Sequence, residues 1–239
     1  FAARIFYTTL ERLPLLDYIL NQFTKKPVNK LDAPVRAVLR AGLAQARYMN
    51  VPLPAAVNES VKLTKALGKA SAAGMVNAVL RRAASAKVCE SEFADPLDRL
   101  ATYYCLSRPV AQLFYEQFGE EAFPLAAAFY DKPKTTIRVN TLRTNDAALT
   151  ALLQSEGHTV KPGPWAGALV IEFAGSPAAS AAFKEGLFHV QGLASQFAAL
   201  CVDAKPGQQV LDLCAAPGGK SLTLAEAMQD KGQLVSGEF

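Results

Sequence analysis

The chain has 239 residues, of which 51% are hydrophobic and 19% are charged. This length is enough for one large domain or for two to three small domains with a buried core. Its apolar runs all fall short of the ~20 residues that a membrane-spanning helix needs. We therefore expect no membrane partner.

Cysteine and histidine are sparse. The four cysteines form no Cys-x-x-Cys pair, and there are only two histidines. We therefore expect no metal site. Scattered cysteines suit the free thiols of a reducing cytoplasm, which is the expected location. The first residues, 1–7, have the pattern of the middle of a helix and lack a signal peptide, so we expect a piece of a longer protein.

Positive charge is concentrated in the first third of the chain. Residues 1–88 hold 14 Lys and Arg against 4 Asp and Glu, a net charge of +10, whereas the remainder carries −6. Such a field on a small module favours a polyanionic partner such as RNA. The alternative is a solvated surface that only keeps the module soluble.

Residues 1–86 are predicted to form a compact bundle of helices, because apolar residues recur at three- and four-residue spacing. Expected helices run from a cap at Asp32 to about Asn50, from Ala55 to Leu67 with Gly68 as its end, and from Ala72 to Ala84. Basic residues share helix faces and are candidate RNA-binding groups: Arg36, Arg40 and Arg47 on one helix, Lys62 and Lys65 on the next. Phosphate contacts would offset their mutual repulsion. Long side chains that only cover a core helix are the alternative.

Residues 87–98 turn acidic and are predicted to form a linker. A small α+β domain is predicted after it. Its helices are expected at Leu100–Phe118, Glu120–Tyr130 and Asn145–Ser155, and its strands at Thr135–Asn140, Ala168–Phe173 and Gly186–Gln191, with a further helix to about Val202. The predicted domains are 1–88, 96–185 and 186–239.

A strand, a loop of small residues and a helix follow one another from Val210 to Met228. This order predicts the first βα unit of a Rossmann-like nucleotide-binding sheet. The next strand, Gln233–Phe239, would place Glu238 where an acid commonly holds a ribose diol. A Walker phosphate loop is disfavoured because it needs glycine where Cys214 stands. A plain structural turn for the loop, and a surface position without a binding role for Glu238, stay open.

Five segments resemble known families. Asp212–Lys220 resembles the S-adenosylmethionine loop of RNA (cytosine-C5)-methyltransferases, and His189–Ser195 resembles that family's Val-Gln-Asp-x-Ala-Ser segment, with Gly192 for Asp. Arg138–Arg143 resembles its Arg-x-Asn motif. Pro54–Val61 and Gly74–Arg81 are similar to the antitermination factor NusB. The chain therefore resembles the Sun/RsmB/Fmu branch, which acts on small-subunit (16S) ribosomal RNA.

The resemblance implies a multidomain fold: an all-α NusB-like bundle, a small α+β domain, and the start of a Rossmann-like α/β methyltransferase domain. It implies S-adenosyl-L-methionine as cofactor, bound by Cys214, Ala215, Ala216, Pro217, Gly218, Gly219, Lys220 and Glu238, although the family usually has Asp at the last position. It implies ribosomal RNA as partner and adds Arg138 to the RNA-binding candidates.

The family's chemistry uses a cysteine that adds to C6 of cytosine, in Pro-Cys and Thr-Cys-Ser motifs. Neither motif occurs in this sequence. We therefore expect no catalytic residue within it, and the nucleophile beyond its end. A non-catalytic RNA-binding module is the alternative function, and a scaffold for a protein partner is a third.

Overall fold

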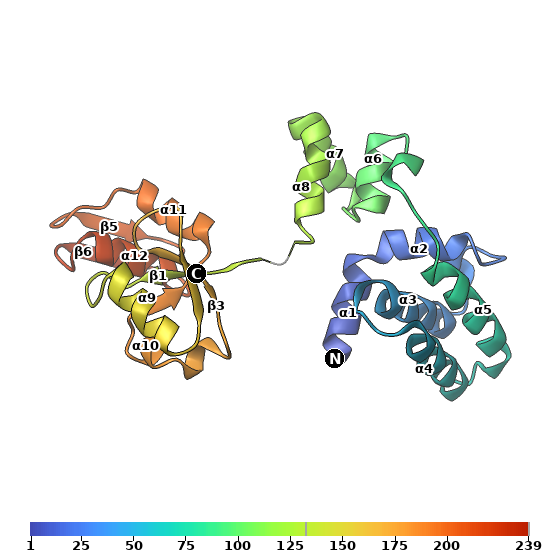
Figure 1. The fold of residues 1–239 in the computed structure, drawn as a ribbon. Helices are drawn as coiled ribbons and strands as arrows, with labels where there is room; N and C mark the ends of the chain where they lie inside the picture. Colours follow the sequence, from blue (N-terminus) through green and yellow to red (C-terminus); the bar gives the residue numbers. More distant parts are fainter. Residues whose placement is uncertain (132, 239) are drawn as a thin grey trace. The chain divides into compact units, whose positions relative to one another are not determined.

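The computed structural model describes residues 1–131 and 133–238. The chain divides into two compact units, Phe1–Asp131 and Lys132–Phe239. The colours and labels of Figure 1 identify the helices and strands of each unit. Within the part of the chain that the structure describes, none of the helices has the length and apolar character needed to cross a membrane. The finer domain boundaries at 88, 96 and 186 stay predictions.

The first unit begins with a helical bundle. Its helices are α1 (Ala2–Glu11), α2 (Leu13–Asn21), α3 (Ala33–Tyr48), α4 (Leu53–Ala66) and α5 (Ala73–Ala84). Leucine and isoleucine side chains from α2, α3 and α5 are fully buried between them: Leu16, Ile19, Leu20, Leu39, Leu43 and Leu80. The predicted all-α bundle is confirmed.

Proline and glycine mark the ends of these helices. Pro14, Pro34 and Pro54 each stand in the first turn of a helix, where a missing N–H costs no hydrogen bond. Gly68, with φ of 72°, follows the end of α4 as predicted. Asp32 stands at the start of α3, but the predicted cap is wrong. Its side chain makes no cap hydrogen bond and pairs with Lys69 instead, at 2.7 Å.

The rest of the first unit is a set of shorter helices. They are α6 (Pro96–Asp98), a π-helical turn (Arg99–Tyr103), α7 (Arg108–Phe118) and α8 (Ala122–Ala128). The predicted single helix over Leu100–Phe118 is wrong. Cys105 has a positive φ of 57°, and α7 starts afresh with Pro109 in its first turn. Proline cannot donate to the preceding turn, so the helix cannot run through it.

The second unit begins with a four-stranded antiparallel sheet. Its elements are β1 (Thr135–Val139), α9 (Asp146–Ser155), β2 (Thr159–Pro162), β3 (Ala168–Glu172), α10 (Ala181–Lys184) and β4 (Phe188–Val190). The strand order is β2-β3-β1-β4, which with this βαββαβ sequence is a ferredoxin-like arrangement. Leucines of α9 pack on one face of the sheet, against Ile137, Val139, Leu169 and Ile171 (Figure 1).

Strand β2 is missing from the sequence-based prediction. It is an edge strand of four residues and ends at Pro162. A short edge strand can include a proline because one side of it forms no ladder. The strand is short and its apolar and polar residues do not alternate clearly, so the sequence pattern did not predict it.

The last elements form a second, parallel sheet. They are α11 (Leu193–Cys201), β5 (Gln209–Asp212), α12 (Gly219–Ala227) and β6 (Gln233–Ser236). Strands β5 and β6 pair in register from Gln209 with Gln233 to Asp212 with Ser236. The predicted strand–loop–helix–strand order is present, but β6 ends at Ser236 and so is shorter than the predicted strand. Phe239 lies outside the described residues. Several aliphatic side chains here are about half exposed, namely Leu211, Leu213, Leu222 and Val235.

Gly42 on α3 provides a test of bundle packing. A Cβ there would lie against Ser60 Oγ and within 2.8 Å of Leu80 Cδ1. We predict that Gly42→Ala lowers the free energy of unfolding by roughly 1–3 kcal/mol, because the helices have no room to separate cheaply. Thermal unfolding followed by circular dichroism measures it.

Gly74 on α5 is the matched control, since a Cβ there meets nothing within 4 Å. Gly74→Ala should raise stability by about 0.5–1 kcal/mol through helix propensity. Equal effects of the two substitutions would contradict the close approach at Gly42.

Candidate functional site

The loop between β5 and α12 is fixed by backbone hydrogen bonds to the strand beside it. Gly237 N donates to Asp212 O at 2.8 Å, and Ala215 N donates to Gly237 O at 3.0 Å. Gly218, the residue before α12, has φ of 102°. Only glycine adopts this conformation without strain, so the turn into the helix depends on it.

Asp212 joins the strand, the loop and the helix. One carboxylate oxygen accepts from Cys214 N at 3.3 Å, and the other accepts from Ser221 Oγ at 2.7 Å. Ser221 Oγ also lies 3.1 Å from Ser236 Oγ on β6. Sequence reasoning missed Asp212 as a site residue, although it belongs to the motif. Its position at the carboxyl end of a strand is the signal that could have found it.

Glu238 lies against the same loop. Its Oε2 accepts a hydrogen bond from Ala216 N at 2.8 Å, across 22 residues of sequence. The side chain is exposed, so its second oxygen can reach a ligand. The structure therefore brings Glu238 to the loop, as the spacing predicted.

A hollow of about 570 Å³ opens beside the loop. Its lining is mostly apolar and consists of Ala215, Ala216, Pro217, Gly218, Ser221, Leu222, Ala225, Leu234 and Ser236. Cys214, Gly219, Lys220 and Glu238 are not part of this lining, although Glu238 contacts the loop through Ala216 N. The first N–H groups of a helix have no partner within it. Apolar walls, free N–H groups and a carboxylate suit a small molecule with a ring and hydroxyl groups.

Gln191 links α12 to the antiparallel sheet through hydrogen bonds. Its Oε1 accepts from Thr223 Oγ1 at 2.9 Å, and its Nε2 donates to Ser195 Oγ at 3.2 Å. Its backbone pairs with Thr136 on β1, at 3.1 Å and 2.7 Å. Gln191, in the segment after β4, thus contacts β1, α11 and α12, and α12 begins at the loop.

A buried ion pair makes a second link. Arg138 Nε on β1 lies 3.1 Å from Glu226 Oε2 on α12, with side chains 7% and 4% exposed. Burial raises the pKa of Glu226, and the charge of Arg138 opposes that rise. His189 Nδ1 lies 3.9 Å from the other carboxylate oxygen, and burial lowers its pKa. Arg138 is committed to the interior here, and its expected contact with RNA stays a prediction.

The other predicted RNA-binding residues have different surroundings. Arg40 forms a bidentate ion pair with Asp17, in which Nε donates to Oδ1 at 2.7 Å. Arg47 NH1 donates to the carbonyls of Ala83 and Ala86, at 3.1 Å and 2.7 Å, at the end of α5. Arg36 is half-buried and its NH1 donates to Asn29 O at 2.9 Å, the exposed Lys62 pairs with Glu59 at 2.7 Å, and Lys65 is exposed. The residues do not gather into one site, and their role in RNA binding stays a prediction.

Three family models match successive regions of the chain. They are the NusB family over residues 1–85, an RsmF/B-like methyltransferase ferredoxin-like domain over 110–176, and 16S rRNA methyltransferase RsmB/F over 199–239. The second match covers most of the antiparallel sheet, and the third covers the loop.

Curated relatives match over nearly the whole chain. The probable ribosomal RNA small subunit methyltransferase B of Bacillus subtilis is 34% identical over 96% of this chain and 52% of its own length. The Synechocystis protein of the same description is 31% identical over 100% and 54%. That of Pseudomonas putida is 34% identical over 93% and 51%. The chain spans about half the length of the curated relatives it matches.

Solved structures agree with these matches. The crystal structure of PH0851 superposes with a TM-score of 0.67 and 25% identity, over 98% of this chain and 53% of that one. A methyltransferase homolog protein from Pyrococcus horikoshii gives 0.55 and 28%, over 60% and 48%. With three matched regions in one order and relatives of one kind, the chain belongs to the RsmB/F family of methyltransferases, in the branch that begins with a NusB-like domain.

Proposed function

We propose that this chain supplies the cofactor loop and RNA-binding elements of an S-adenosylmethionine-dependent enzyme. Its reaction would be methylation of C5 of a cytosine in small-subunit ribosomal RNA. The observation that carries the proposal is the loop Cys214–Lys220, which turns at Gly218 beside a hollow and is contacted by the Glu238 carboxylate. The names of the curated relatives support the ribosomal substrate.

The site suits this cofactor in shape and chemistry. The parallel strands β5 and β6 with α12 between them in sequence are the start of a Rossmann-like sheet in this proposal. Glu238 would hold the ribose hydroxyls, and the apolar wall would take the adenine ring. The N–H groups at the start of α12 would face the carboxylate of the methionine part. When bound, the cofactor supplies the electrophilic methyl group.

C5 of cytosine is a weak nucleophile, and addition of a thiolate to C6 activates it. We assign that task to none of the four cysteines, because the family's Pro-Cys and Thr-Cys-Ser motifs do not occur in the sequence. In addition, burial raises the pKa of Cys105, which disfavours its thiolate. We therefore assign binding and orientation to residues 1–239, and we assign the nucleophile to none of them.

Gly218→Val tests the loop. Valine cannot adopt φ of 102° without strain, so the loop should lose its shape and S-adenosylmethionine binding should fall below detection in isothermal titration calorimetry. Gly192→Ala is the control, because Gly192 has an ordinary φ of −65° and open space around it. Unchanged binding by Gly218→Val would remove this loop as the cofactor site, and no cofactor binding by the full-length protein would favour a non-catalytic RNA-binding module.

Glu238→Gln tests the carboxylate without reshaping the loop. The amide oxygen can still accept from Ala216 N, but it carries no charge for the ribose hydroxyls. We predict cofactor binding weaker by roughly tenfold, from the loss of charge-assisted hydrogen bonds. The same calorimetric titration measures it, and an unchanged affinity would remove Glu238 from the proposed site.

The basic surface of the bundle is tested by salt dependence. Replacing Arg36 and Lys65 by glutamine should lower the slope of log affinity against log salt by about 1.4 for single-stranded RNA, if each contacts one phosphate. Fluorescence anisotropy with ribosomal RNA fragments measures this slope. A slope near zero for the unaltered chain would indicate a protein partner instead.

Residues 1–239 alone should transfer no methyl group to ribosomal RNA, because none of their cysteines is assigned as nucleophile. Incubation with S-[methyl-³H]adenosylmethionine and small-subunit RNA measures incorporation. Label on cytosine C5 would show that a cysteine of this chain performs the addition.

A further inference from the structure

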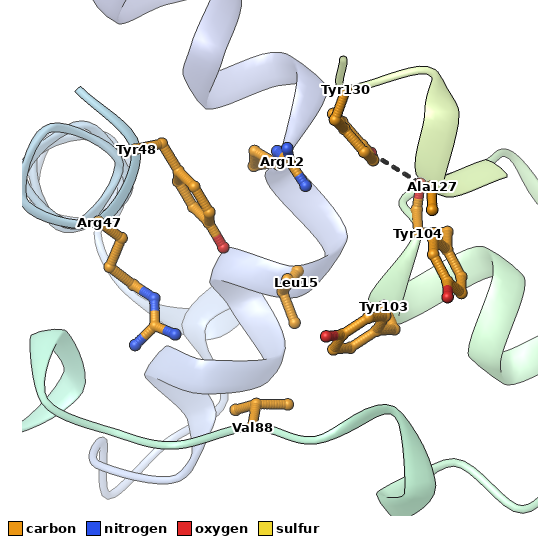
Figure 2. Close-up of a pocket in the computed structure, with 9 residues that line it drawn as sticks. All are labelled: Arg12, Leu15, Arg47, Tyr48, Val88, Tyr103, Tyr104, Ala127 and Tyr130. Atoms are coloured by element: carbon orange, nitrogen blue, oxygen red, sulfur yellow. Dashed lines mark hydrogen bonds between the residues drawn. The ribbon is translucent and has the colours of Figure 1, made fainter. Parts of the chain in front are cut away.

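A hollow of about 340 Å³ lies within the first unit, at the edge of the bundle core, and Leu15 of that core lines it (Figure 2). Its lining comes from the start of α2, the end of α3, the segment after α5, the π-helical turn and α8. The charged and aromatic side chains in it are Arg12, Arg47, Tyr48, Tyr103, Tyr104 and Tyr130. These residues are far apart in sequence, so only the folded unit assembles the hollow.

The lining carries two positive charges and no carboxylate. Elsewhere in the first unit, two half-buried arginines have acidic partners: Arg40 pairs with Asp17, and Arg99 pairs with Glu90. Among the described residues, the structure pairs neither Arg12 nor Arg47 with a carboxylate. The carbonyls at the end of α5 neutralise Arg47 in part, at 2.7–3.3 Å. Burial raises the pKa of Tyr130 and of Tyr104, and the nearby carboxylates of Glu11 and Glu90, which do not line the hollow, raise them further. Glu90 is paired with Arg99, and Arg12 keeps a charge that an anion in the hollow would neutralise.

Tyrosine rings form most of the remaining wall. The Arg12 guanidinium lies over the ring of Tyr130, 3.1 Å from its centroid, and 4.9 Å from that of Tyr48. The Tyr130 hydroxyl donates to Tyr104 O at 2.7 Å, which fixes that ring. Figure 2 shows the hydroxyl ends of Tyr48 and Tyr103 directed toward the interior of the hollow. The rings are thus held in place while hydroxyl groups face the open space.

A ligand that uses this whole lining needs an anionic group and a flat ring with polar edges. A simple anion would leave the tyrosines unused, and an apolar molecule would leave the arginines unpaired. Unpaired RNA bases stack on aromatic rings and on arginine planes, and their phosphates bind arginine. A nucleotide therefore fits both halves of the lining.

We propose that this hollow, the tyrosine–arginine pocket, binds one unpaired nucleotide of an RNA strand, with a polar edge of the base against the Tyr103 hydroxyl and the phosphate on Arg12. The inference rests on the proposed RNA substrate and adds a site for it in the helical unit. Arg47 has a positioning role, because its bonds to the end of α5 hold the wall of the pocket.

The test uses the whole chain and a fluorescein-labelled, single-stranded 12-nucleotide RNA in anisotropy titrations. Tyr103→Leu removes the ring but keeps an apolar side chain, and should weaken binding by roughly tenfold. Arg12→Gln should weaken binding and also lower the salt slope by about 0.7, the share of one phosphate. Tyr103→Leu should leave that slope unchanged. A 12-base-pair RNA duplex should compete poorly, because its bases are already stacked.

Lys25→Gln is the matched control. It removes one positive charge from an exposed position of the same unit, outside the pocket, and should change the affinity less than twofold. Circular dichroism confirms that each variant is folded. If Tyr103→Leu or Arg12→Gln does not fold, photo-crosslinking of the unaltered chain to 4-thiouridine RNA replaces it, with mass spectrometry expected to find Tyr48, Tyr103 or Tyr104 in the cross-linked peptides.

Folded pocket variants that bind RNA as well as the unaltered chain, or cross-links confined to other surfaces, would overturn the pocket and leave the proposed RNA substrate intact. An unaltered chain that binds no RNA would overturn both. Cofactor binding in calorimetry is independent of either result, so the failures can be told apart.

Discussion

Helix α12 begins at the end of the loop that follows β5, and a buried ion pair joins this helix to the antiparallel sheet. Arg138 on β1 and Glu226 on α12 meet at 3.1 Å with almost no exposure to solvent. Each charge is tolerated there because the other is present, and removal of one would leave the other buried and unpaired. The shape of the loop therefore depends on a strand about 80 residues earlier in the chain.

Two carboxylates at the loop have separate tasks. Asp212 is used within the protein, since both of its oxygens accept hydrogen bonds from the loop and from α12. Glu238 uses one oxygen to accept from Ala216 N and keeps the other for solvent or a ligand. This division gives a loop that is shaped before any ligand arrives, which lowers the entropic cost of binding.

The strand, loop and helix from Val210 to Met228 could be predicted from the sequence because their information is local, whereas the cofactor-binding role of the loop stays a prediction. Small residues, a strand before them and a helix after them follow one another without interruption. The helical bundle was likewise encoded in periodic apolar positions. The break before Pro109 was also local, although periodicity alone missed it.

Partners far apart in sequence could not be predicted. The regular spacing of Arg36, Arg40 and Arg47 suggests one shared task, yet Arg40 meets Asp17 and Arg47 meets the carbonyls that end α5. Nothing local to α3 reveals either partner. The tyrosine–arginine pocket is hidden for the same reason, since Arg12, Tyr48 and Tyr130 come together only through tertiary packing.

The half-exposed aliphatic side chains around β5, β6 and α12 affect the self-association of this polypeptide during binding measurements. Apolar surface is exposed to water at Leu211, Leu213, Leu222 and Val235. Such surface promotes association between protein molecules. In concentrated samples the protein molecules would then associate with one another, and the signal of this association would resemble weak ligand binding. Dilute solutions, checked by light scattering, keep ligand measurements free of this artefact.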